Sequence, residues 1–429
     1  MTRMKESGID WIGQIPEEWE VIKFKFLGDV KQGLTYSPSD IVDKDEGILV
    51  LRSGNIQNGV LDFTNNVYVK TKVAESIVLR KNDILITARN GSSALIGKNA
   101  IIDTDIKATF GAFMMVFRTN KSLIAKFAFY LMNISFNFYR TFFTTSTVNQ
   151  LTAAIFNGIE VPLPSISEQQ KIAYFLDKKT AQLDKAKNLL EEQIQKLKDY
   201  RSSLIYETVT KGLDKTVPLK DSGIDWIGQV PEGWEVGKVK YFSQISAGAT
   251  PDRNNSLFWN GNINWMSSGE VNQGIVKHTF ETITDLALKR TSTKLLPKGT
   301  VMLALNGQGK TKGTAAVLAI ESASNQSLAS FIVDNKILNN MYLYYFFVAN
   351  YYNIRGLKGE DRDGLNLQLV SNIVIPLFEI EEQQKIVDFL DKKTVQIDQL
   401  IQIKNKQIDN INKQRQTLIY DYVTGKRRV

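Results

Sequence analysis

The most regular pattern of apolar positions in the sequence lies between Ser167 and Val209. Leucine recurs there every seven residues, and neither glycine nor proline interrupts the stretch; the repeating positions are Leu176, Leu183, Leu190, Leu197 and Leu204. A seven-residue apolar repeat keeps one seam of a helix facing a partner helix, as in a coiled coil. Ser167 followed by Gln170 forms a capping-box pattern, which predicts that the helix begins there. With about 1.5 Å of rise per residue, the helix would be roughly 60 Å long.

A second stretch of the same kind runs from Glu381 to Val423. Its seven-residue positions are Leu390, Ile397, Lys404, Ile411 and Leu418. Lys404 interrupts this apolar seam. It either fixes the register of a helix pair, as a polar core residue does, or lies at the edge of the seam with its amine extended into water. The two stretches together predict a pair of long helices.

The chain consists of two copies of one unit. The segment SGIDWIGQIPEEWEV at 7–21 returns as SGIDWIGQVPEGWEV at 222–236. The start of the first long helix, EQQKIAYFLDKKTAQLD from Glu168, returns as EQQKIVDFLDKKTVQID from Glu382. The sequences between these repeated segments, 23–157 and 238–372, share little identity. Two dissimilar segments, each between nearly identical flanking sequences, indicate two domains with different versions of one function.

Both middle segments have the pattern of mixed α+β domains. Each contains short β-rich runs and then one aromatic-rich helix, at 124–138 and 338–352, followed by a strand. We expect the aromatic side chains of these helices to form core rather than to stack on bases.

Connectivity sets the direction of the long helices. The first leads from the first domain into the second, so the second must run back antiparallel to it, with one domain at each end. The predicted fold class is α+β, with two pseudo-twofold-related α+β domains separated by a long antiparallel two-helix coiled coil. The predicted boundaries are 1–160 for the first domain, 161–215 for the first helical region, 216–374 for the second domain and 375–429 for the second helical region.

Composition narrows the class of protein. An apolar content of 43% is ordinary for a globular chain, and no apolar run is long enough to cross a membrane. The N-terminal segment lacks the apolar core of a signal peptide, and cysteine is absent, so we expect a cytoplasmic protein with no disulfide and no membrane partner. A single histidine, His278, supports neither a zinc site nor a histidine-based catalytic triad. We therefore expect no catalytic residues, no bound metal and no cofactor.

The formal net charge of +8 suits a polyanionic partner. Two related but unequal domains at a fixed separation suit an asymmetric ligand made of two parts. Double-stranded DNA is the natural case, because half-sites one helical turn apart require readers about 34–36 Å apart. The long helices would then act as a ruler.

These features resemble the specificity (S) subunits of type I restriction–modification enzymes over essentially the whole chain. The resemblance rests on the paired SGIDWIG openings with Trp19 and Trp234, the strands ending at Pro164 and Pro376, and the two EQQKI…FLDKKT helices. Residues 248–251, Gly-Ala-Thr-Pro, also match a turn of that family, whereas the first copy has Gly-Leu-Thr-Tyr at 33–36. The resemblance implies two target-recognition domains in a non-catalytic DNA-binding subunit. It further implies, as partners, two modification (methyltransferase) subunits, which would dock on the helices, and restriction subunits in the full complex.

The loops between the predicted strands contain the side chains that read base edges. Arginine and lysine suit guanine, and asparagine and glutamine suit adenine. In the first domain the predicted DNA-contacting residues are Arg52, Asn55, Arg89, Asn90, Ser92, Asn149 and Gln150. In the second domain they are Ser267, Ser268, Glu270, Asn306, Gln308, Lys310, Asn325, Gln326, Arg362, Asn366 and Gln368. The alternative for each is a solvated loop residue or a turn former.

Two other functions compete with DNA recognition. Residues 304–311, ALNGQGKT, fit a relaxed nucleotide-binding P-loop, but a P-loop requires a helix that begins at the Lys-Thr pair, and the sequence that follows has the pattern of a strand. A coiled-coil scaffold whose domains bind proteins rather than DNA is the other alternative. For the basic tail at 426–428, we expect a solvated chain end.

Overall fold

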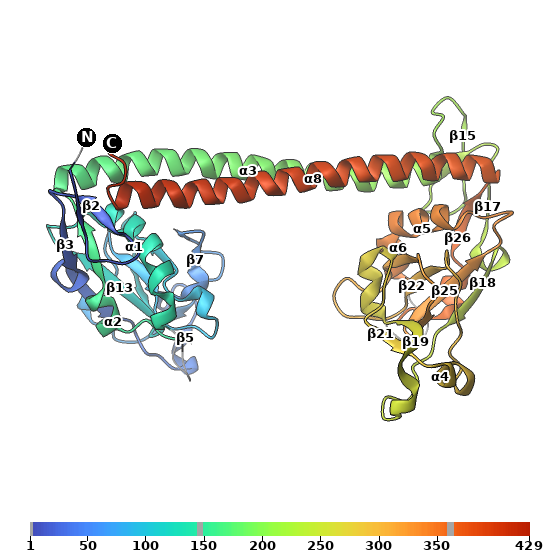
Figure 1. Cartoon of the computed structure of the whole chain (residues 1–429), viewed down its shortest axis with the longest axis horizontal. Coiled ribbons are helices and arrows are strands. Elements are labelled where there is room, and N and C mark those ends of the chain that lie inside the picture. Colours follow the sequence, from blue (N-terminus) through green and yellow to red (C-terminus); the bar gives the residue numbers. More distant parts are fainter. Residues whose placement is uncertain (1–2, 144–148, 358–363) are drawn as a thin grey trace. The chain divides into compact units, whose positions relative to one another are not determined.

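The computed structural model describes residues 3–143, 149–357 and 364–429, and the chain divides into two compact units (Figure 1). Unit 1 contains Met1–Leu190 and Lys406–Val429, and unit 2 contains Glu191–Asn405. The two long helices are α3, Ile166–Lys211, and α8, Ile380–Val423, and each contributes one part to each unit.

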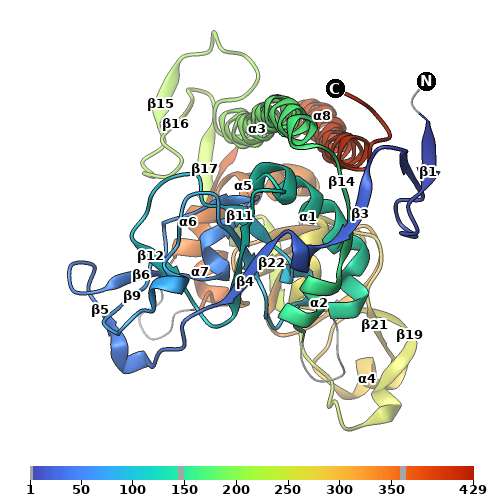
Figure 2. The same ribbon diagram turned by 90° about the vertical axis from the view of Figure 1, so that its left-hand side faces the viewer.

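The two long helices lie side by side within each unit (Figures 1 and 2). In unit 1 the rings of Phe175 and Tyr422 are 4.5 Å apart, and Asp184 pairs with Arg415 at 3.4 Å. In unit 2 Arg201 pairs with Asp398 at 3.4 Å. Residue numbers fall along α8 as they rise along α3, so the pairing is antiparallel, as predicted. The continuous stretch without glycine or proline explains why each helix forms without a break.

Two details of the helices differ from, or add to, the sequence analysis. Helix α3 begins at Ile166 rather than at Ser167, because Ser165 caps it: its hydroxyl accepts from the backbone N–H of Glu168 at 3.3 Å. In unit 2 the Lys404 amine donates to the side-chain oxygen of Gln193 at an exposed position. Lys404 therefore lies at the edge of the seam and also links the two helices there.

The domain of unit 1 contains two four-stranded sheets. One is antiparallel with the strand order β11–β10–β13–β4, and the other has the order β12–β6–β9–β5 with β12 parallel to β6. The bounds are β4 Gly28–Gln32, β5 Ile41–Val42, β6 Ile48–Leu51, β9 Tyr68–Val69, β10 Ile84–Thr87, β11 Asn99–Ile101, β12 Ala108–Phe110 and β13 Met114–Thr119. A short pair, β3 Glu20–Lys23 with β14 Glu160–Leu163, closes the domain next to the start of α3. The remaining elements of this domain are the hairpin β7 Ile56–Gln57 and β8 Val60–Leu61, and the helices α1 Ala125–Tyr139 and α2 Ala153–Gly158.

Unit 2 repeats this plan with a five-stranded sheet, β18–β25–β22–β23–β20, and a three-stranded sheet, β21–β19–β24. The bounds are β18 Ser243–Ala247, β19 Trp259–Met266, β20 Ile275–Val276, β21 Glu281–Ile283, β22 Val301–Ala304, β23 Ala315–Leu318, β24 Ala323–Ser324 and β25 Leu328–Val333. Strand β17 Glu235–Lys238 pairs with β26 Val374–Leu377, as β3 pairs with β14. Its helices are α4 Asp285–Arg290, α5 Asn340–Ala349, α6 Tyr351–Gly356 and α7 Leu367–Ser371.

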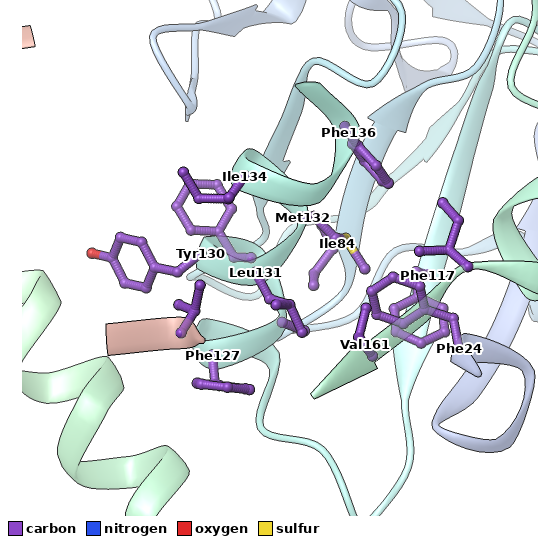
Figure 3. Packing of buried hydrophobic residues seen from close by; sticks show 14 of the residues in the cluster. Phe24, Ile84, Phe117, Phe127, Tyr130, Leu131, Met132, Ile134, Phe136 and Val161 are labelled. Atoms are coloured by element: carbon purple, nitrogen blue, oxygen red, sulfur yellow. The ribbon is translucent and has the colours of Figure 1, made fainter. Parts of the chain in front are cut away.

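The core of unit 1 lies between α1 and the antiparallel sheet (Figure 3). Phe127, Leu131 and Phe136 of α1 are buried in the same cluster as Ile84 of β10 and Phe117 of β13; Figure 3 shows these side chains. Burial removes their apolar surface from water, which is the main force that holds the helix on the sheet. In unit 2, α5 occupies the equivalent place with Tyr342, Phe346 and Phe347. The aromatic-rich helices are core elements, as expected.

Each repeated SGIDWIG opening packs on the C-terminal end of a long helix. In unit 2 the Tyr206 hydroxyl, near the end of α3, donates to the backbone oxygens of Trp226 and Ile227. In unit 1 the Tyr420 hydroxyl, near the end of α8, donates in the same way to Trp11 and Ile12. Short strand pairs flank the openings: β1 Met4–Glu6 with β2 Gln14–Pro16, and β15 Leu219–Asp221 with β16 Gln229–Pro231. No helix in the part of the chain that the structure describes is long and apolar enough to cross a membrane.

Candidate nucleic-acid interface

Many of the repeated helix residues fasten each domain to its helix. Gln169 is fully buried; its side-chain oxygen accepts from the Ile124 N–H at 2.8 Å, and its amide nitrogen donates to backbone oxygens of Ser122 and Pro164. Gln383 does the same in unit 2, accepting from Asn339 and donating to Ile337 and Phe378. Each glutamine thus ties the start of a long helix to the segment that leads into α1 or α5.

A tyrosine forms the second fastening in each unit. The Tyr130 hydroxyl donates to Asp177 at 2.7 Å and lies 3.1 Å from the Thr180 hydroxyl. Tyr345 makes the matching contacts with Asp391 and Thr394. Burial raises the pKa of both tyrosines well above the ordinary value, and the neighbouring aspartate adds to this shift. Gln169, Asp177 and Thr180 of the EQQKI…FLDKKT motif are therefore explained by packing of the domain, rather than by contact with DNA.

The tryptophans of the PEEW and PEGW segments pack against the glycines that end the long helices. Gly212 and Gly425 have φ of +70° and +72°, a left-handed conformation that ends a helix without strain only in glycine. A Cβ on Gly212 would come 3.2 Å from the Trp234 ring, and one on Gly425 would come 3.2 Å from the Trp19 ring. In both units, therefore, a glycine ends the long helix and a tryptophan packs against it.

The basic tail at 426–428 is exposed, as expected of a solvated chain end, but its side chains also bind the rest of unit 1. The Lys426 amine donates to the backbone oxygen of Gln14 at 2.5 Å, and Arg427 pairs with Asp421 at 3.1 Å. Arg428 bridges Glu18 and Glu168 and lies over the Trp19 ring. Gln14 and Glu18 belong to the opening segment that packs on α8, so the tail folds back on that segment and holds it there.

Away from the helices, the loops of the two domains correspond residue by residue. In both units a glycine lies very close to the backbone of another segment. A Cβ on Gly33 would come 2.1 Å from the Gly111 oxygen, and a Cβ on Gly248 would come 2.1 Å from the Ser324 oxygen. The next residue donates its N–H to Phe110 in unit 1 and to Ser324 in unit 2, at 2.7 and 2.8 Å. The first copy therefore builds the same turn, although its sequence departs from Gly-Ala-Thr-Pro.

The register of the strands extends this correspondence to the loop residues. The Leu51 oxygen accepts from Gly111 in unit 1, and the Met266 oxygen accepts from Asn325 in unit 2, so Arg52 corresponds to Ser267. The Phe113 oxygen accepts from Ala88, and the Ser327 oxygen accepts from Leu305. Phe113 therefore corresponds to Ser327, and Arg89 corresponds to Asn306.

Three of the predicted residues of unit 1, Arg52, Arg89 and Asn90, line a single cavity of about 540 Å³. One backbone and one side-chain contact hold two of its walls in place: Arg89 donates its N–H to the Phe113 oxygen, and the Thr87 hydroxyl lies 3.3 Å from that of Ser53. The Lys98 amine reaches the Ser53 oxygen, and burial lowers the pKa of this lysine. Arg52 and Arg89 are thereby presented on one side of the domain.

Two of the residues predicted to contact DNA, Asn55 and Glu270, are buried instead, so that prediction was wrong for them. Asn55 is 1% exposed, and its side-chain oxygen accepts from the Arg52 N–H at 2.9 Å while its amide donates to Asp62. Glu270 is 4% exposed, and its carboxylate accepts from the N–H groups of Ser267 and Phe280. Both side chains cap the short 3₁₀ helices Ser53–Asn55 and Ser268–Gln273, which leaves no free polar edge for a base.

The other predicted residues of unit 1 lie around the same loop. Asn90 accepts from the Ser92 N–H and so shapes the turn, while Ser92 is exposed. Asn149 donates to the Gly91 oxygen, and Gln150 forms a backbone bridge with Arg89. These contacts bring the segment before α2 next to the β10–β11 loop.

In unit 2 the predicted residues divide between exposed and structural positions. Asn306, Gln308 and Lys310 are exposed in the turn between β22 and β23, and Gln368 is exposed on α7. Ser267 and Ser268 are half-buried, and the Ser267 hydroxyl donates to Glu270. Asn325 and Asn366 accept from backbone N–H groups as turn and helix caps, and the Gln326 side chain contacts Thr250. Arg362 lies outside the described residues.

The P-loop alternative does not fit the observed loop. Lys310 and Thr311 lie in a turn that leads into β23, so no helix N-terminus is available to cradle a phosphate. His278 is exposed, and no cluster of metal-ligating residues was found among the described residues.

Phe113 was not among the predicted residues, although it lines the cavity and is 61% exposed. It belongs to the run GAFMMVFRT, whose apolar residues gave no sign that one of them faces solvent. Only the position of the β12–β13 turn places it outside the core.

The model for the type I restriction modification DNA specificity domain matches residues 16–197 and 231–413, one match for each copy of the repeat. The chain therefore belongs to this family, whose specificity subunits are non-catalytic. Over 97% of this chain and 94% of that protein, it is 26% identical to the type I restriction enzyme MjaVIII specificity subunit of Methanocaldococcus jannaschii. It is also 31% identical to the EcoKI specificity subunit of Escherichia coli, over 45% of this chain and 43% of that protein.

Solved structures share the fold. A chain from a study of complex assembly and conformational transition of the type I R-M system superposes with a TM-score of 0.74 at 16% identity, covering 96% of this chain and 99% of that chain. The HsdS subunit from Thermoanaerobacter tengcongensis gives a TM-score of 0.53 at 16% identity, covering 96% and 98%. The predicted arrangement of two α+β domains with long helices is thus confirmed as the fold of this family.

Proposed function

We propose that this protein is the DNA-specificity subunit of a type I restriction–modification complex and reads an asymmetric site in two parts, one domain to each half-site. The observation that carries the proposal is the pairing of like scaffolds with unlike loops: Arg52 and Arg89 in unit 1 stand where Ser267 and Asn306 stand in unit 2. Different side chains at equivalent positions give different base preferences. Membership of the specificity family supports the same conclusion.

The predicted site residues enter this proposal in two groups. Those that are exposed or line the cavity are proposed to contact DNA: Arg52, Arg89, Asn90, Ser92, Asn306, Gln308, Lys310 and Gln368. Those that cap or bridge backbone, such as Asn149 and Asn325, are proposed to shape the loops. We also propose that the four segments 1–160, 161–215, 216–374 and 375–429 act as alternating readers and spacers, in the cytoplasm.

The proposed partners beyond DNA are two modification subunits and, in the full complex, restriction subunits. A partner that binds twice needs the same surface twice. Lys171 and Lys178 on α3 are exposed, and so are Lys385 and Lys392, the identical residues on α8. None of the described side chains forms an ion pair with these amines, and the spacing of seven places each pair on one helix face. We propose that these faces contact the modification subunits.

A binding experiment tests the proposal against the scaffold alternative. The full chain, copurified with its methyltransferase partner, is titrated with the duplex whose methylated sequence is mapped from the host genome. Specific binding to that duplex over random DNA is expected, with log K falling steeply as log salt rises because phosphate contacts release counterions. Equal affinity for random duplexes, or affinity that hardly changes with salt, would overturn the DNA-reading proposal and favour the scaffold.

The ruler role has its own test. Inserting one heptad into α3 and one into α8, at positions that face each other, preserves the seam. The variant is expected to recognise the same two half-sites with a longer gap between them. An unchanged gap in the methylated sequence would overturn the ruler role and leave the DNA-reading role intact.

A further inference from the structure

The cavity of unit 1 has an exposed aromatic wall, which the proposed function does not explain. Phe113 is 61% exposed, although it lies between two buried residues of the sheets, Phe110 and Met114, that are each 1% exposed. Single exposed aromatic side chains are common on protein surfaces, but this one borders a cavity, where it offers apolar contact to a bound ligand. The cavity also contains Leu34, Tyr36 and Met114, so its lining is apolar beyond Phe113 itself.

Phe113 is held firmly in place. Its backbone oxygen accepts from the N–H groups of Ala88 and Arg89, both at 3.0 Å. These hydrogen bonds hold the backbone of Phe113 beside that of Arg89, one of the two cavity arginines. The Arg89 guanidinium lies over the Phe113 ring, 5.5 Å from its centroid, within cation–π range. A single ligand can therefore contact the Phe113 ring and the Arg89 guanidinium together.

The two cavity arginines are also free to bind a ligand. Two other arginines of unit 1 are paired with carboxylates: Arg118 binds both oxygens of Asp83, and Arg415 pairs with Asp184. By contrast, among the described residues no side chain or carbonyl accepts a hydrogen bond from the guanidinium of Arg52 or Arg89. An unpaired guanidinium beside an apolar wall suits a ligand that offers acceptors next to an apolar group.

Adjacent guanine and thymine offer this combination in the major groove. Guanine presents the O6 and N7 acceptors to arginine, and thymine presents its 5-methyl group to an apolar side chain. We infer that unit 1 reads a guanine through Arg89 and the 5-methyl group of a neighbouring thymine through Phe113. This inference rests on the proposed function. Unit 2 cannot do so in this way, because Ser327 and Asn306 occupy the two equivalent positions.

Deoxyuridine in place of thymidine gives a direct test, because it lacks only the 5-methyl group. Duplexes carrying the mapped site are prepared with each thymine of either half-site replaced in turn. With the full complex, one replacement in the half-site of unit 1 is expected to weaken binding by roughly 4-fold, the loss for one buried methyl group. Phe113→Ala should bind thymine and uracil duplexes equally at that position. A matched control is Phe26→Ala, since Phe26 is 58% exposed in the same unit but does not line the cavity, and it should keep the wild-type ratio.

The outcomes separate this inference from the proposed function. Specific binding with no thymine whose uracil penalty depends on Phe113 would overturn the inference and leave the function standing. Loss of all preference for the mapped site would instead be a failure of the proposed function. For the guanine, 7-deazaguanine removes the N7 acceptor; its penalty is expected in wild type and absent in Arg89→Ala. An equal penalty in both proteins would refute the role of Arg89.

Discussion

Strand β6 of unit 1 is followed by Arg52, and strand β19 of unit 2 is followed at the equivalent position by Ser267. The start of α3 in unit 1 carries Gln169 bound to three backbone groups, and the start of α8 carries Gln383 bound in the same way. The two units thus agree where a domain meets its helix and differ at the loops. Identity between the copies lies at contacts that hold each domain on its helix, and divergence lies at the loops that we propose to contact DNA.

The largest effect is expected from the fastening glutamines. Gln169→Leu removes the partners of the Ile124 N–H and of the Ser122 and Pro164 carbonyls, of which the last is buried, and this should cost about 3 kcal/mol of unit 1 stability. Gln383→Leu should cost unit 2 about the same amount. Hydrogen exchange in the buried strands β13 and β25 would report the stability of the two units separately. The exposed neighbour Gln170→Leu is the control, and unequal costs would break the likeness between the fastenings.

The next largest effect distinguishes the DNA contacts proposed for unit 1 from those proposed for unit 2. Arg89→Ala should weaken discrimination by about 1–3 kcal/mol for mutations in one half-site only, and Asn306→Ala should do so in the other. Competition binding with duplexes altered in either half-site measures this difference. If either variant relaxed both half-sites equally, the one-domain-per-half-site division would fail.

A smaller effect is expected from the fastening tyrosines. Tyr130→Phe removes one hydrogen bond to Asp177 and should cost about 1 kcal/mol, with Tyr345→Phe as its counterpart in unit 2. Tyr174→Phe is the control, because Tyr174 is 73% exposed.

These tyrosines also predict an alkaline limit to stability. Burial raises their pKa in the folded state, so the folded protein keeps protons that the unfolded chain releases near pH 10. Their contribution is complete below about pH 10 and is lost as pH rises above it. Urea unfolding at pH 8 and at pH 10.5 should show a smaller alkaline loss in the double Phe variant than in wild type. An identical loss would exclude the tyrosines as its source.

The smallest effect is expected from the contacts that attach each SGIDWIG opening to the long helix on which it packs. In unit 2, covalent chain connects the end of α3 to the opening that packs on it, whereas in unit 1 Arg428 bridges α8 to Glu18 and Glu168. The bridge is partly exposed, so Arg428→Ala should cost only about 0.5 kcal/mol. Thermal unfolding at low salt should detect the loss, and high salt should abolish the difference. Arg427→Ala, which removes a contact within the end of α8 itself, is the matched control.

The sequence predicted the architecture well because repetition and heptads are long-range signals. Two helices without glycine or proline, and one connection between two copies, leave only an antiparallel pair. Local polarity was less informative. Asn55 and Glu270 have the residue types of base readers, yet each is buried as a cap, and a polar loop residue looks the same in either role. Phe113 was missed for the opposite reason, since its place in an apolar run resembles core until the turn before β13 is known. The contacts of the basic tail with the opening segment could not be predicted from the sequence either, because they join residues more than 400 positions apart.

The contact between Tyr420 and Trp11 spans 409 residues, whereas its counterpart between Tyr206 and Trp226 spans 20. All of unit 2 is one continuous segment, so it leaves the ribosome complete before the last part of unit 1 does. Unit 1 must wait for Lys406–Val429, and its opening segment, with Trp11 and Ile12, lacks its helix until then. Loop closure over such a distance is slow, and exposed apolar segments attract one another while they wait. During synthesis, the first domain to be made is therefore the last to be completed.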